Sequence, residues 1–179
     1  MESELNVLDS DARGVLCCAT ALRLGGGLYI LAADADLEQL YYTMDGGVRS
    51  KVREYLGGAR QESMLHDALR AFREVSSTKF HNGSGDSFFD AGIQVFGMTL
   101  EGVLNAPTPD LVDQVFHQAL VSASLLEKVA SQGLELFERN CQEESISAVS
   151  ESYEQVIKSA GSSALQYRKV AMRITTESR

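Results

Sequence analysis

Residues 108–139 read TPDLVDQVFHQALVSASLLEKVASQGLELFER, and this part of the sequence gives the clearest indication of a helical fold. Thr108, Pro109 and Asp110 form a helix start signal. A Thr side chain caps free N–H groups, Pro suits the first helical position, and an acid is favoured at a helix N-terminus. Apolar residues then recur at helical spacing to the end of the stretch. The pattern predicts one helix over 109–139, roughly 46 Å long at the α-helical rise.

Two further long helices are predicted on either side of this one. Residues 87–104 are apolar on most sides, which is typical of a helix in the centre of a core. An apolar stripe over 145–174 predicts a third helix, with a weak break at 161–163. Long helices joined by short connections indicate an all-α fold with a bundle-like core. The length of 179 residues fits a single domain, 1–179.

The first half of the chain is rich in glycine, which predicts shorter pieces. A helix over 8–24 is expected to end at the three glycines 25–27, because glycine readily takes the left-handed conformation found after helices. An alternative is a β-hairpin at about 15–32 with the glycines in its turn, which would make the fold α+β. Few β-branched residues occur in this stretch, so the helix is the favoured interpretation.

Glycine pairs divide the following residues in the same way. Short helices are predicted from Asp34 to the pair at 46–47, from Val48 to the pair at 57–58, and over 60–75. The predicted domain therefore has three parts. They are short helices in 1–75, a polar loop at 76–87, and a long-helix core with a basic end in 88–179.

Charge is unevenly distributed along the chain. The net charge is -9, and residues 80–157 alone carry 12 acids against 2 bases. Residues 49–79 carry 7 bases against 4 acids, and residues 158–179 carry 5 bases against 1 acid. An acidic protein is a poor match for nucleic acid, because affinity for phosphates comes mainly from Lys and Arg. Only the basic C-terminal segment offers such a contact.

The composition also favours a soluble protein of the cytoplasm. The three cysteines, Cys17, Cys18 and Cys141, match no metal motif and no disulfide framework, so reduced thiols are expected. The N-terminus is acidic and lacks the basic and apolar regions of a secretory signal. Charges or glycines interrupt the apolar stretches, so no membrane span is expected.

No specific catalytic or metal motif is present. Residues 81–87 contain His, Ser and Asp and precede a helix, so a small enzyme or an anion site using this loop is one alternative. Glu62 and His66 share a helix face, and Asp34 and Asp36 could bind a divalent cation, but helix-surface and helix-start roles explain these residues equally well. The sequence predicts no cofactor.

His117 is the one candidate cofactor ligand. It lies in an apolar run, and a histidine in a helical core can bind haem iron. A helical domain holding haem or another apolar ligand between 87–104 and 109–139 is therefore an alternative function. However, His117 lies at the edge of the apolar stripe, and this position favours an ordinary, solvated histidine over a haem ligand.

The favoured interpretation is a non-enzymatic helical protein that acts through protein–protein contact, as a self-associating assembly subunit or an adaptor. Basic residues near the C-terminus are expected to meet the acidic surface of a neighbouring copy, since such complementarity guides association. The expected interaction residues are Arg168, Lys169, Arg173 and Arg179, together with Lys158. A viral coat or other structural subunit is a further alternative.

Overall fold

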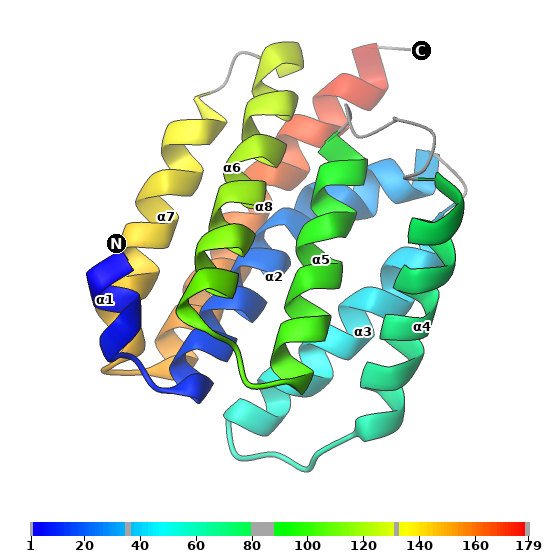
Figure 1. Ribbon diagram of the computed structural model, residues 1–179. Helices are drawn as coiled ribbons and strands as arrows, with labels where there is room; N and C mark the ends of the chain where they lie inside the picture. The colour runs from blue at the N-terminus through cyan, green and yellow to red at the C-terminus, as the bar shows by residue number, and fades with distance from the viewer. Residues whose placement is uncertain (1, 35–36, 80–87, 131–132, 178–179) are drawn as a thin grey trace.

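Every described element of the protein is an α-helix, which confirms the all-α prediction (Figure 1). The computed structural model describes residues 2–34, 37–79, 88–130 and 133–177. The helices are α1 (Glu2–Val7), α2 (Ser10–Asp34), α3 (Glu38–Tyr55), α4 (Glu62–Lys79), α5 (Phe88–Leu104), α6 (Pro109–Ala130), α7 (Leu134–Val149) and α8 (Tyr153–Glu177).

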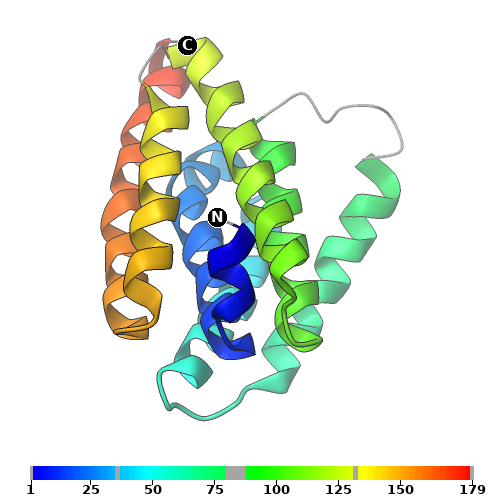
Figure 2. The same ribbon diagram turned by 60° about the vertical axis from the view of Figure 1, so that its left-hand side comes forward.

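Helix α2 is the central helix of the bundle (Figures 1 and 2). It packs against α3, α5, α6, α7 and α8. Its side chains from Val15 to Leu24 are buried almost without interruption. An enclosed helix must be apolar around its whole circumference, and this explains why α2 has no clear polar face.

The three glycines at 25–27 do not end a helix, and the alternative hairpin at 15–32 is wrong, because both stretches lie inside α2. The glycines allow other helices to approach the backbone closely. A Cβ on Gly26 would overlap the carbonyl oxygen of Ala164 in α8, and a Cβ on Gly27 would lie 3.0 Å from the Phe88 ring. Each glycine costs about 0.5–1 kcal/mol of helix propensity, which the contact with neighbouring helices offsets.

The two short helices predicted between Asp34 and Gly58 are one helix, α3. Gly47 lies inside it, where an added Cβ would be 2.5 Å from the Cβ of Ala68 in α4. The next glycine pair does end the helix as expected, with Gly57 in the left-handed conformation at φ 84°. The sequence signals for a helix stop and for close helix packing are both glycine, so the sequence alone did not separate them.

The helix predicted over 109–139 is two helices, α6 and α7, with Gly133 at φ 64° before α7. Its predicted start is confirmed, since the Leu111 N–H donates to Thr108 Oγ1 at 3.2 Å. The third predicted helix, 145–174, is also divided differently. Residues 145–149 belong to α7, and α8 begins at Tyr153 and continues through Gly161.

The prediction that no stretch suits a membrane needs one correction. By length and composition, Ser10–Ala33 in α2 could cross a membrane. However, 78% of its most apolar window is buried inside the protein. The core helix of a bundle has the same composition, so the central position of α2 accounts for it.

The packing of α2 on α8 leads to a test with a matched pair of glycine variants. Gly26→Ala places a methyl group on the α8 backbone and is expected to lower the free energy of unfolding by about 1–3 kcal/mol. Gly161→Ala, in open space in the middle of α8, is expected to raise it by about 0.5–1 kcal/mol. Urea denaturation of dilute protein measures both. Equal effects of the two substitutions would contradict the close-packing role of Gly26.

Candidate functional site

The predicted haem ligand His117 lies on the outside of the bundle. Its side chain is exposed and lines a hollow of about 300 Å³ with residues of α6 and α7, including Lys128 and Arg139. Phe96 and Leu100 of α5, on the helix that would form one side of such a ligand site, are buried in the core. His117 thus faces away from the space between α5 and α6 that the ligand-binding alternative requires.

The other candidates from the sequence do not form a common site. The 81–87 loop, Asp36 and Arg179 lie outside the described residues. His66 is exposed on α4. Among the described residues, no group of three His, Cys, Asp or Glu side chains could hold a metal ion. Burial raises the pKa of the Cys17 thiol to about 12, so this cysteine is a poor nucleophile.

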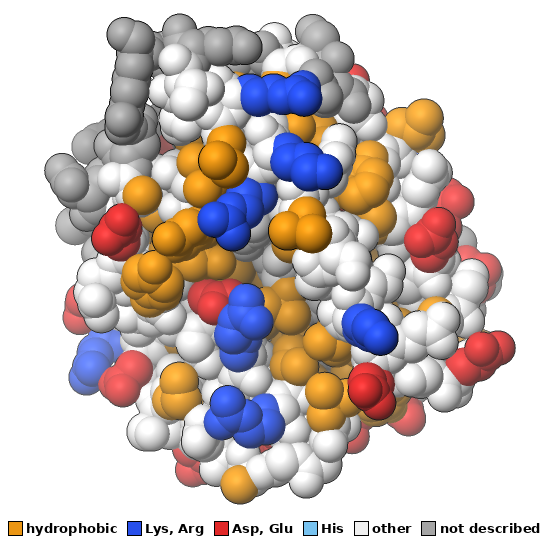
Figure 3. All heavy atoms as spheres, turned by 180° about the vertical axis from the view of Figure 1, so that it is seen from behind, with side chains coloured by type: hydrophobic (Ala, Val, Ile, Leu, Met, Phe, Trp, Pro, Cys, Tyr) orange, Lys and Arg blue, Asp and Glu red, His pale blue; other side chains and the backbone are white. Residues whose placement is uncertain are grey.

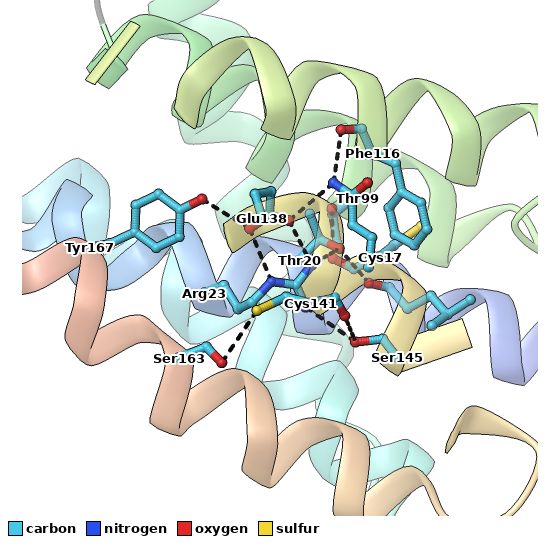
Figure 4. Close-up of polar contacts among 12 residues, drawn as sticks. Cys17, Thr20, Arg23, Thr99, Phe116, Glu138, Cys141, Ser145, Ser163 and Tyr167 are labelled. Carbon is cyan, nitrogen blue, oxygen red and sulfur yellow. Dashed lines mark hydrogen bonds and ion pairs between the residues drawn. The ribbon is translucent and has the colours of Figure 1, made fainter. Parts of the chain in front are cut away.

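A buried ion pair that the sequence analysis missed joins α2 to α7 (Figure 4). Arg23 donates to Glu138 Oε1 at 2.7 Å and to Oε2 at 3.2 Å, and both side chains are fully buried. Burial alone would lower the pKa of Arg23, but the adjacent carboxylate outweighs burial and raises it. The sequence did hold a signal for Arg23, because this residue interrupts an otherwise apolar stretch, whereas Glu138 shares its helix face with the polar Gln142 and Ser145.

Further hydrogen bonds surround the pair and tie in two more helices. The Tyr167 hydroxyl of α8 donates to Glu138 Oε2 at 3.0 Å. Gln142 Nε2 donates to Glu138 Oε1 and to the Phe116 carbonyl of α6, both at 3.1 Å. Burial, followed by the charge of Glu138, raises the pKa of Tyr167, which keeps its hydroxyl a donor. The cluster is buried and satisfied from within, so we assign it a structural role.

The most distinctive surface feature is a groove between α3 and α8, floored by the glycines of α2. We call it the α3–α8 groove. It encloses about 260 Å³. Apolar and aromatic side chains line it together with Arg49 and Arg168, one from each wall. Figure 3 shows this side of the molecule, where Lys and Arg side chains lie among apolar ones. The lining residues include Gly25, Gly26, Tyr29, Tyr41, Ile157, Gly161 and Leu165.

Three tyrosines cluster at this groove, with Tyr29 on α2 and Tyr41 and Tyr42 on α3. The rings of Tyr29, Tyr41 and Tyr42 lie with their centroids 5.7–6.0 Å apart, and Tyr42 is 51% exposed. The Arg168 guanidinium lies over the Tyr29 ring, 5.6 Å from its centroid. Arg49 is hydrogen-bonded to Asp45 at 2.5 Å. Arg168 forms no ion pair with a described carboxylate, so its charge remains available.

The C-terminal half of α8 brings three of the predicted interaction residues together. Arg168, Lys169 and Arg173 are all exposed, and none forms an ion pair within the part of the chain that the structure describes. Leu165 and Met172 lie among them and are 56% and 48% exposed. We call these five residues the basic face of α8. Exposed apolar side chains grouped with cations are typical of contact surfaces.

Acidic side chains cluster at the junction of α7 and α8. Glu143, Glu144 and Glu151 line a hollow of about 570 Å³ at this junction, and Glu154 lies on the adjoining turn of α8. We call these four residues the acidic corner. All four are exposed and unpaired with any described cation. The two ends of α8 therefore carry opposite charge.

Comparison with known proteins finds no matching family model, no matching curated protein and no matching solved structure.

The buried ion pair leads to a double-substitution test. Glu138→Leu leaves Arg23 buried without its carboxylate and is expected to cost about 3–5 kcal/mol in unfolding free energy. Adding Arg23→Met removes the stranded charge, so the double variant is expected to be more stable than Glu138→Leu alone. Chemical denaturation of both single variants and the double variant measures the coupling. If the change in unfolding free energy of the double variant equals the sum of the changes in the two single variants, the two charges do not stabilise each other.

Proposed function

We propose that this protein is a non-enzymatic helical subunit that self-associates through the basic face of α8. One observation carries the proposal. Exposed apolar side chains and cations without ion-pair partners among the described residues occupy the same face of one helix. Leu165 and Met172 provide apolar area whose burial favours association. The charges of Arg168 and its neighbours orient the two partners as they associate.

The composition of the α3–α8 groove, which lies beside this face, supports the proposal that the partner is a protein. Tyr and Arg are the residue types that most often anchor protein–protein contacts, because they offer a large area together with a polar end. Tyr42 and Arg168 provide both types in exposed positions. Gly161 at the rim has open space above it, which leaves room for a side chain of another molecule.

The charge of the whole chain supports a second copy as that partner. The net charge is -9, and the acidic corner lies on the same molecule as the basic face. A neighbouring copy thus supplies the acidic surface that the basic face requires. The same net charge would repel a nucleic acid from most of the surface. A protein partner therefore explains the charge pattern better.

Sedimentation velocity as a function of salt tests the proposal. Screening shortens the reach of charges from about 10 Å at 0.1 M salt to about 3 Å at 1 M. We expect particles heavier than the 19.5 kDa chain at the lower salt and a shift toward the monomer at the higher salt. A monomer at every concentration and salt would contradict self-association.

Charge-reversal variants locate the surface. Lys169→Glu is expected to weaken association by about tenfold or more, because it removes a cation from the contact. Lys128→Glu on α6 makes the same change in net charge at an exposed site elsewhere and is expected to have little effect. Equal weakening by both variants would mean that net charge, and not this face, controls association. Nucleic acid that co-purifies with the wild type and is lost with Lys169→Glu would overturn the protein partner.

A further inference from the structure

Helix α8 presents one continuous exposed stripe. Glu154, Gly161, Leu165, Arg168 and Met172 are exposed and are spaced by three, four or seven residues, so they lie on one side of the helix. The stripe is acidic at its start and basic at its end. Its middle consists of a large apolar side chain, Leu165, beside a glycine with open space above it.

Resting on the proposed function, we infer that two copies pair through this stripe, with their α8 helices antiparallel about a two-fold axis beside position 163. In such a pair, residues equally far from 163 on either side face each other. Leu165 of each copy then lies over Gly161 of the other, where no atom of the same chain lies within 4 Å of a Cβ position. A side chain fits there as a knob into a hole.

The charges agree with the antiparallel direction of the two helices. With the axis beside 163, Glu154 faces Met172 of the second copy and lies within one turn of Arg168, Lys169 and Arg173 there. Glu151 faces the same basic end. Each acidic corner therefore meets a basic face, and the contact occurs twice. The acidic and basic ends of the stripe thus favour the antiparallel direction, and the packing of Leu165 on Gly161 selects the register.

In a two-fold dimer, both ends of α8 take part in the same interface, so the assembly is closed. A head-to-tail contact between the same surfaces would leave one basic face and one acidic corner free on each assembly and would continue into rings or filaments. A two-fold pair leaves neither surface free. A particle of twice the 19.5 kDa chain mass that does not grow further is therefore expected.

One mismatch makes this register unusually testable. Lys158 is exposed and faces Arg168 of the second copy in this arrangement, so two like charges oppose each other on each side of the axis. Lys158→Glu converts each of these pairs into an attractive one. This substitution is expected to tighten the dimer by roughly tenfold, whereas most surface substitutions would leave it unchanged or weaken it.

Disulfide trapping tests the arrangement directly. Protein with Gly161→Cys is mixed with protein carrying Leu165→Cys under a mild oxidant, and the native cysteines are buried. The proposed register brings the two new Cβ atoms within disulfide range, where Cα atoms are at most about 7 Å apart. Intact-mass analysis is expected to show the mixed dimer as the main product. In the control, Gln155→Cys replaces Gly161→Cys. In the proposed register, residue 155 faces residue 171 of the second copy, so it lies roughly 9 Å along the helix axis from Leu165 of that copy at the α-helical rise per residue.

Leu165→Asp gives a second readout that does not depend on cysteine. It is expected to abolish the dimer, while Leu136→Asp, at a 64% exposed leucine on α7, is expected to leave it intact. Circular dichroism checks that both variants fold. If the wild type dimerises but neither mixed disulfides nor the Leu165→Asp effect is seen, the α8 arrangement is wrong and self-association stands. A monomeric wild type would overturn both.

Discussion

Helices α2 and α8 pack on each other extensively, and at Gly26 they approach more closely than any other residue would allow. An added Cβ there would overlap the backbone of Ala164, so only glycine permits this distance between the helices. The approach helps to enclose α2, which then has to be apolar on every side. It also leaves α8 on the outside of the bundle, with its far side free to contact another molecule (Figure 2).

Enclosing α2 also determines how its one buried cation is accommodated. A charge taken out of water is costly unless it is paired and hydrogen-bonded. Arg23 meets both conditions through Glu138, and Glu138 in turn accepts from Tyr167 and Gln142. The cluster connects α2, α6, α7 and α8 at one point, so it favours one arrangement of these helices over others of similar apolar burial. We attribute fold specificity, more than net stability, to this cluster.

Much of the helical content could be predicted from the sequence, but its division into helices could not. Thr108 gave a correct start for α6, because a cap is a local signal. Gly26 and Gly47 were misread as helix ends, because their role depends on Ala164 and Ala68, which are distant in sequence. For the same reason the sequence did not pair Arg23 with Glu138. Clustered charge is visible along the chain, so Arg168, Lys169 and Arg173 are candidates from the sequence, but their exposure beside Leu165 could be seen only in the fold.

We propose that the outer side of α8 is a contact surface between copies of this chain. Hydroxyl-radical footprinting of the wild type above and below its dissociation midpoint tests it directly, since oxidation follows the exposure of each side chain. Met172 and Leu165 are expected to become protected at high concentration, and His66, exposed on α4 away from α8, is expected to react equally in both samples. Unchanged oxidation of Met172 and Leu165 in a sample that has clearly associated would show that the outer side of α8 is not the contact surface.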